Sequence, residues 1–148
     1  MSLLAGVVGV QGDVSEHRDA FRRAGDALGY GIETVAVRDS GVVPDCDIIA
    51  LPGGESTTIS RLLRREGIDE EVREHVESGG ATLATCAGLI VLGNPNDERV
   101  DSLGLLDVEV ERNAFGGQRE SFEAEVDVDG LDEPFHAVFI RAPIVSEV

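Results

Sequence analysis

The sequence predicts an α/β domain built on a doubly wound, mostly parallel sheet. Short apolar runs that suit buried strands alternate with segments of helical periodicity over the first part of the chain, which is the pattern of β-α-β units. The chain has 148 residues, of which 42% are hydrophobic, and this is enough for one domain with a sizeable core. No repeat or low-complexity linker interrupts the chain, so we expect residues 1–148 to form a single domain.

The first strands and the first helix are predicted from the apolar pattern. Residues 3–10 are a continuous apolar run, as expected of a strand that is buried on both faces. Residues 13–28 have helical periodicity, and Gly29 and Gly31 follow as stop signals. The side chains on the apolar stripe of this helix are Val14, Phe21, Ala24 and Leu28. Further strands are predicted at residues 33–37, 47–51 and 81–85.

Two more helices are predicted between the third and fourth strands. Ser56 is the expected cap of the first of them, and Gly67 ends it. Asp69 is the expected cap of the next helix, which runs to about Ser78 and stops at Gly79.

The pattern changes after Leu92 towards shorter, antiparallel-leaning strands. Residues 94–97 are expected to be a loop, because they combine Asn, Pro and Asp. In residues 122–128, apolar and acidic side chains alternate, which predicts a strand with one face in water. Other strands are predicted at residues 105–112 and 137–140.

Cys86 stands where a strand turns sharply into a helix. Ala87 and Gly88 follow it, and their small size lets the backbone turn and expose the thiol at the strand end. Nucleophiles of hydrolases occupy the same strand–turn–helix position, and a cysteine there is activated by the helix N-terminus and a nearby base. The alternative is a buried structural cysteine at the end of a core strand.

Three loops are expected to meet at the carboxyl edge of the sheet, where ligands bind in open α/β folds. They contain Gln11 and Gly12, residues 52–56, and residues 86–88. The Gly53–Gly54 pair before a helix offers unobstructed backbone N–H groups, which suit a phosphate, a carboxylate or a developing oxyanion.

Nucleotide and metal sites are disfavoured by the sequence. The chain has no lysine and therefore no Walker motif, and no Gly-x-Gly-x-x-Gly follows the first strand. His17, His75 and His136 are far apart in the sequence, and neither Cys46 nor Cys86 belongs to a Cys-x-x-Cys pair. Two cysteines are too few for a disulfide scaffold, and no segment resembles a signal peptide or a membrane span, so we expect a cytoplasmic protein.

Six segments spread along almost the whole chain match one known family. They are residues 9–12 (Gly-Val-Gln-Gly), 51–58 (Leu-Pro-Gly-Gly-Glu-Ser-Thr-Thr), 85–89 (Thr-Cys-Ala-Gly-Leu), 111–116 (Glu-Arg-Asn-Ala-Phe-Gly), 121–123 (Ser-Phe-Glu) and 139–143 (Phe-Ile-Arg-Ala-Pro). Together they resemble the glutaminase subunit of pyridoxal 5′-phosphate synthase. The Pro-Gly-Gly-Glu-Ser-Thr-Thr run separates this family from other class I glutamine amidotransferases, which share its flavodoxin-like fold and its cysteine turn.

The resemblance implies a role for each matching residue. Cys86 would attack the side-chain amide of glutamine, release ammonia and leave a glutamyl thioester that water hydrolyses to glutamate. The backbone N–H groups of Gly54 and Ala87 would form the oxyanion hole, and Gln11 would lie by this loop and respond to the partner. The residues implied to bind glutamine are Gly53, Gly54, Glu55, Arg112, Ile140 and Arg141.

The resemblance also implies a partner and no cofactor or metal of its own. The ammonia would pass to a synthase subunit, a TIM barrel that makes pyridoxal 5′-phosphate, within a large hetero-oligomer. The alternatives for individual residues are structural: Glu55 as an acid in the first helical turn, Arg112 as a surface ion pair and Arg141 as a charge on an edge strand.

The sequence departs from the family at its C-terminal end. The family pairs its cysteine with a His and a Glu that follow the Ile-Arg-Ala-Pro strand, and no His-x-Glu follows residues 140–143 here. Ile144 stands where a His is expected, and Gly117 where an Arg is common. We therefore expect a domain truncated at its C-terminus, and three hypotheses remain.

The first hypothesis is a glutaminase whose last residues are absent from the sequence. The second is a catalytically inactive module that binds the synthase. The third is a different cysteine hydrolase that uses His17, His75 or His136 as its base.

The charge of the chain is extreme. The formal net charge is −17, and all 12 basic residues are arginines. Such a surface repels nucleic acid and anionic membranes, and it repels itself unless salt screens it. We hypothesise adaptation to a high-salt cytoplasm; an ordinary acidic surface is the alternative.

The salt hypothesis predicts a direction for stability. The free energy of unfolding should rise from low ionic strength to molar KCl, with the melting temperature increasing by several degrees, because the salt screens repulsion that is strongest in the compact state. Chemical and thermal unfolding of the protein across a KCl series measures this. Equal stability at both ends of the series contradicts the hypothesis.

Overall fold

A four-stranded parallel sheet forms the centre of the molecule. The computed structural model describes residues 1–112 and 121–148; residues 113–116 of the family motif and Gly117 lie outside these ranges. The order of the sheet is β2-β1-β3-β4, and all three pairings are parallel. Its strands are β1 (Ser2–Val8), β2 (Gly31–Val37), β3 (Ile48–Leu51) and β4 (Ala81–Ala84).

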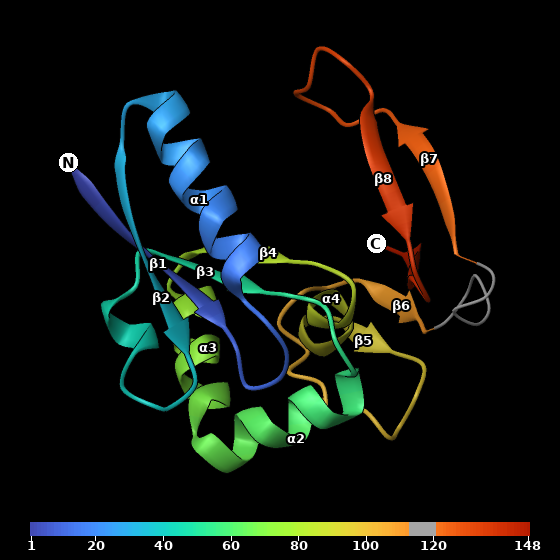
Figure 1. The fold of residues 1–148 in the computed structure, drawn as a ribbon. Helices are drawn as coiled ribbons and strands as arrows, with labels where there is room; N and C mark the ends of the chain where they lie inside the picture. The colour runs from blue at the N-terminus through green and yellow to red at the C-terminus, as the bar shows by residue number, and fades with distance from the viewer. Residues whose placement is uncertain (113–120) are drawn as a thin grey trace.

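Helices cover both faces of this sheet, so the predicted doubly wound α/β architecture is confirmed (Figure 1). Helix α1 (Ser15–Leu28) lies on one face, and α2 (Ser56–Glu66) and α3 (Ile68–Glu77) lie on the other. A short 3-10 helix, η1 (Val43–Asp45), packs against α3, and α4 (Ala87–Leu92) follows β4.

The alternating side chains of the central strands supply two cores. Val7 and Ala50 belong to a small cluster with Val14 at the start of α1. Their neighbours Val8, Ile49 and Leu51 belong to a larger cluster on the other face. The members of that cluster from α2 and α3 are Ile59, Leu63, Ile68 and Val72. The predicted burial of the first strand on both faces is therefore confirmed.

The face of helix α1 that packs on the sheet differs from the predicted apolar stripe. Ala24 and Leu28 are exposed, whereas Phe21 packs against the small cluster and Gly25 is buried. The helix begins at Ser15 rather than residue 13. Gly29 ends it, as predicted, and has the left-handed conformation.

Both predicted helix caps are wrong. The N-cap of α2 is Glu55, whose carboxylate accepts hydrogen bonds from the backbone N–H groups of Thr57 and Thr58, while Ser56 is the first helical residue. The N-cap of α3 is Gly67, because this glycine ends α2 and starts α3 without an intervening loop. Asp69 therefore lies within the first turn of α3.

The second part of the chain forms two small sheets rather than an extension of the central one. The first joins β5 (Asn94–Pro95), β6 (Glu109–Glu111) and β9 (Ile144–Glu147), and the second is a hairpin of β7 (Phe122–Val126) and β8 (Phe135–Phe139). The hairpin projects to one side of the central sheet (Figure 1). Pairing of β6 with β9 and of β7 with β8 is antiparallel, as predicted for this region.

Several boundaries in this region differ from the prediction. Residues 94–97 are not entirely loop, because Asn94 and Pro95 pair with β6. The strand expected at residues 105–112 is reduced to Glu109–Glu111, and β9 was not predicted. These strands are short and depend on partners distant in the sequence, so local patterns define them poorly.

The close approach of α4 to β3 gives a first stability prediction. A Cβ atom at Gly88 would lie 1.9 Å from the carbonyl oxygen of Leu51. Gly88→Ala should therefore destabilise the fold by about 3 kcal/mol or more, because backbone must move to relieve the overlap. Gly31→Ala is the matched control, since the nearest atom to its Cβ would be 3.6 Å away, and its effect should stay within about 0.5 kcal/mol. Equal melting temperatures for the two variants would contradict this packing.

The cap of α2 predicts how the stability of the fold changes at acidic pH. Burial of the Glu55 carboxylate favours its neutral form, but hydrogen bonds from Thr57 and Thr58 prevail and lower its pKa from 4.5 to about 2. Since the folded-state pKa is below the unfolded value, the ionised cap stabilises the fold above pH 4.5, and this contribution is lost as the pH falls towards about 2.

Glu55→Gln should remove this part of the pH dependence. The variant should unfold more easily at neutral pH, and its stability should fall less steeply than that of the unmodified protein between about pH 5 and 3. Urea unfolding at a series of pH values measures it, with the exposed Glu133→Gln as control. If the free energy of unfolding depended on pH in the same way for Glu55→Gln and the unmodified protein, the role of the cap would be refuted.

Candidate active site

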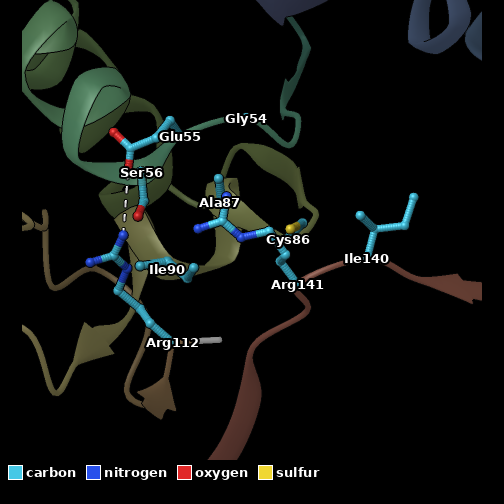
Figure 2. Close-up of a pocket in the computed structure, with 9 residues that line it drawn as sticks. All are labelled: Gly54, Glu55, Ser56, Cys86, Ala87, Ile90, Arg112, Ile140 and Arg141. Atoms are coloured by element: carbon cyan, nitrogen blue, oxygen red, sulfur yellow. Dashed lines mark hydrogen bonds and ion pairs between the residues drawn. The ribbon is translucent and has the colours of Figure 1, made fainter. Parts of the chain in front are cut away.

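A cavity of about 380 Å³ opens beside Cys86 at the carboxyl edge of the sheet. The residues that line it come from the loops after β3, β4 and β8, from the start of α2, from α4, and from the position directly after β6 (Figure 2). They are Gly54, Glu55, Ser56, Cys86, Ala87, Ile90, Arg112, Ile140 and Arg141. Seven of the nine were singled out from the sequence as Cys86, Ala87 or a member of the implied glutamine site; Ser56 and Ile90 were not.

Cys86 lies in a strained turn between β4 and α4. Its φ of 49° and ψ of −112° are unusual for a residue with a side chain, and its side chain is partly exposed, unlike that of the buried Cys46. The turn needs Gly88, because the Leu51 carbonyl occupies the space of a side chain there. The interpretation of Cys86 as a buried core cysteine is therefore wrong, and its position matches that of a nucleophile.

The glycine loop after β3 faces this turn. A Cβ on Gly53 would lie 3.5 Å from the Cβ of Cys86, so the loop passes directly beside the thiol. Gly54 has a φ of 148°, which favours glycine. The next backbone N–H, that of Glu55, donates a hydrogen bond of 2.9 Å to Oε1 of Gln11. Gln11 thus holds the loop in place from the end of β1, although it does not line the cavity itself.

Glu55 and Arg112 face each other across one side of the cavity (Figure 2). Nη2 of Arg112 lies 3.3 Å from Oε1 of Glu55, and the Arg112 side chain is only 12% exposed. Nη1 of Arg112 donates a hydrogen bond to Oδ2 of Asp97. Arg112 is thus a largely buried member of an ion network rather than a surface pair. Glu55 is the N-cap of α2 rather than an acid within its first turn, and it also lines the cavity.

Ile140 and Arg141 follow β8 on another side of the cavity. Arg141 has a φ of 47°, and with Cys86 it is one of the two non-glycine residues with positive φ in the described ranges. Figure 2 shows its guanidinium reaching towards Ala87, whereas the Ile140 side chain points away from the group and is half exposed. Arg141 lies outside any strand, so it is not an edge-strand charge.

None of the three histidines lies at the cavity within the described parts of the chain. His17 lies on α1, and Nε2 of His75 is 3.1 Å from the carbonyl oxygen of Ala81. His136 lies between Glu123 and Glu125 on the exposed hairpin, and hydrogen bonds to these carboxylates, that of Glu125 first, raise its pKa. The structure therefore does not support the hydrolase that would use one of these histidines as its base.

Asp97 was not predicted from the sequence as a residue of the site. Its carboxylate accepts from Arg112, which is 15 residues further along the chain, and from the backbone and side chain of Arg99. Hydrogen bonds from Arg99 and then from Arg112 hold its pKa well below the usual range. The sequence around an acidic residue in a polar loop does not show such a contact. The pairing of Asp97 with Arg112 could therefore be recognised only in the folded structure.

Two negative findings concern the described residues alone. No helix in them is both long and apolar enough to cross a bilayer. No group of three or more His, Cys, Asp or Glu side chains within residues 1–112 and 121–148 is arranged to hold a metal ion.

Chemically, the cavity combines a thiol in a strained turn, a glycine loop and two guanidinium groups. A thiol in such a turn suits nucleophilic attack on a carbonyl carbon, and adjacent backbone N–H groups suit the resulting oxyanion. Guanidinium groups suit a carboxylate on the substrate. The arrangement therefore fits acyl transfer from a small amide that also carries a carboxylate.

Comparisons with known proteins agree with this chemistry. The model of the SNO glutamine amidotransferase family matches residues 7–148. The pyridoxal 5′-phosphate synthase subunit PdxT of Halorubrum lacusprofundi is 64% identical over 145 residues, which are 97% of this chain and 74% of that protein. The PdxT subunit of Methanosarcina barkeri is 56% identical over 147 residues, or 95% of this chain and 74% of its own length.

A solved structure extends the agreement to the fold. A crystal structure of a glutamine amidotransferase superposes with a TM-score of 0.80 at 42% identity, over 97% of this chain and 74% of its own. This chain therefore spans about three quarters of the length of these relatives. Because the family model covers nearly all of its residues and the relatives are this similar, the chain belongs to the SNO glutamine amidotransferase family.

Proposed function

We propose that the protein hydrolyses L-glutamine to glutamate and ammonia and passes the ammonia to the synthase subunit that makes pyridoxal 5′-phosphate. The observation that carries this proposal is Cys86, held in a strained strand–helix turn beside a cavity with two arginines. The PdxT relatives support the same activity and do not favour the catalytically inactive, synthase-binding alternative.

Cys86 is the nucleophile in this mechanism. Its thiol gives up a proton as the sulfur bonds to the side-chain amide carbon of glutamine. The carbon–nitrogen bond then breaks, and this proton goes to the leaving nitrogen, which departs as ammonia. The oxygen of a water molecule then bonds to the thioester carbon, the carbon–sulfur bond breaks, glutamate is released, and a proton of the water restores the thiol. Dividing one difficult hydrolysis into two steps is the advantage of a covalent intermediate.

The oxyanion of both steps is assigned to the backbone N–H groups of Gly54 and Ala87. Both residues line the cavity with Cys86, Gly54 from the loop after β3 and Ala87 from the start of α4. Gln11 positions the Gly54–Glu55 segment through its hydrogen bond to the Glu55 N–H. A partner that moved Gln11 would therefore act on the oxyanion loop, and this is the regulatory role we propose for it.

The remaining lining residues suit the amino-acid end of glutamine. Arg112 and Arg141 supply guanidinium groups for the α-carboxylate, and Glu55 supplies a carboxylate for the α-ammonium. Ile140 would contribute backbone, since its side chain points away from Cys86 (Figure 2), and so would Gly53, which passes beside Cys86 without lining the cavity. The contacts of Glu55 to Thr57 and Arg112 through Oε1 are both 3.3 Å long, which leaves this oxygen able to accept from a ligand.

The setting that we propose is a hetero-oligomer with a TIM-barrel synthase in a salt-rich cytoplasm. Ammonia released in water at neutral pH is protonated and is then no nucleophile, so direct transfer between subunits preserves its reactivity. The net charge of −17 supports the salt-rich setting through the screening argument given above.

Removing the thiol tests the mechanism. Cys86→Ala should reduce ammonia release from glutamine, assayed with the synthase subunit, by about 10⁴-fold or more, because no other described residue at the cavity can form the thioester. Glutamate and ammonia are measured together, and mass spectrometry of a quenched reaction should find the glutamyl adduct on the unmodified protein alone.

Cys46→Ala is the matched control. Cys46 is the other free thiol, and it is buried away from the cavity with burial raising its pKa. Its loss should lower stability and leave the turnover of the folded protein unchanged. Ammonia release that survives Cys86→Ala, or that Cys46→Ala abolishes in folded protein, would overturn the assignment. Binding of the synthase without any turnover by the unmodified protein would instead favour the inactive module.

A further inference from the structure

The Arg112 guanidinium is fixed from outside the cavity. Besides its contact with Glu55, it donates through Nη1 to Oδ2 of Asp97, and its backbone N–H lies 3.5 Å from Oδ1 of Asn96. The side chains of Arg112 and Asp97 are only 12% and 16% exposed. An ion pair that is this shielded from water is stronger and more rigid than one on the surface.

Asp97 is fixed in turn by Arg99. Its Oδ1 accepts from the backbone N–H of Arg99 at 3.0 Å and from Nε at 2.9 Å, and its Oδ2 accepts from Nη2 at 2.6 Å. The bidentate pairing sets the plane of the carboxylate as well as its position. A backbone hydrogen bond of 3.1 Å from Val100 to the Asp97 carbonyl closes the turn that carries both residues.

The charges in this network balance. Glu55 and Asp97 contribute two negative charges, and Arg99 and Arg112 contribute two positive charges. Without Arg99, the positive charge of Arg112 would be shared between two carboxylates. Their negative charges would then cancel much of the attraction of Arg112 for a further anion. Arg99 compensates the charge of Asp97 from the solvent side, where its side chain is 78% exposed, so Arg112 retains attraction for an anionic group in the cavity.

We infer that Asp97, held by Arg99, is a positioning residue that aims the Arg112 guanidinium at the carboxylate of the bound amino acid. Neither Asp97 nor Arg99 lines the cavity, so both act through Arg112. Two of the five N–H donors of Arg112 are engaged by Asp97 and Glu55, and because the guanidinium is planar these two contacts fix the direction of the others. The inference rests on the proposed glutaminase function.

Steady-state kinetics of ammonia release, measured with the synthase subunit, test this role. Asp97→Asn should raise KM for glutamine about tenfold and leave kcat within about twofold, because the contact serves ground state and transition state alike. Arg99→Gln should raise KM about threefold, and Arg99→Lys should recover part of this, since it keeps the charge without the bidentate geometry. Asp97→Glu should likewise recover part of the loss.

Asp101→Asn is the matched control. Asp101 belongs to the same loop and pairs with Arg64 of α2, but its side chain is 61% exposed and the pair does not reach the cavity. Its KM and kcat should equal those of the unmodified protein. An unchanged KM in Asp97→Asn overturns the inference, as does an equal increase in Asp101→Asn or a fall in kcat alone.

Equilibrium binding separates this inference from the proposed function. In a Cys86→Ala background, calorimetry with L-glutamine should give a Kd that Asp97→Asn raises by the same factor of about ten. If the unmodified protein releases no ammonia but the Kd rises as expected, the glutaminase proposal fails and the positioning role stands. If ammonia release is normal but the Kd is unaffected, the positioning role fails and the glutaminase proposal stands. If neither turnover nor binding of glutamine occurs, both fail.

Discussion

The contact between the Leu51 carbonyl and Gly88 is the constraint on which the site depends. It brings the start of α4 against the end of β3, so the turn at Cys86 and the glycine loop at residues 53–54 lie side by side. The strained backbone of Cys86 is tolerated because α4, which follows it, and β3, against which α4 packs, are buried in the main core. A thiol and a glycine loop that are 32 residues or more apart in the sequence thereby become parts of one cavity.

Charge is distributed very unevenly between the cavity and the rest of the surface. The chain has 29 acidic and 12 basic residues, yet two arginines and a single acidic residue line the cavity. A zwitterionic amino acid presents both signs of charge, so a strongly negative cavity would reject its carboxylate. The ion network around Arg112 keeps the charge at the cavity close to neutral although the surface is acidic. Arg99 offsets the charge of Asp97, which would otherwise reduce the attraction of Arg112 for an anion.

The parallel sheet and most of the cavity were predictable from the sequence, whereas the caps and the Asp97 network were not. Buried strands such as β1 and β3 leave an unbroken apolar run, and Cys86 with its small neighbours leaves a recognisable turn. The family motifs then identified Arg112 and Arg141, which no local pattern would reveal. Short strands such as β6 depend on contacts between distant segments, and so does the pairing of Asp97 with Arg112. A local stretch of polar sequence does not show which acidic side chain will contact which basic one.

Glu55 shows why a local rule fails at a functional site. Ser56 is the better cap by propensity, but a serine hydroxyl at the cap would carry no charge to hold Arg112. The longer carboxylate of Glu55 satisfies two backbone N–H groups of α2 and still reaches Nη2 of Arg112, so the start of the helix and the wall of the cavity share one side chain. Because its neighbour Ser56 is then buried as the first helical residue, the chain enters α2 one residue earlier than capping preferences predict. One carboxylate therefore caps the helix and supplies the negative charge beside Arg112.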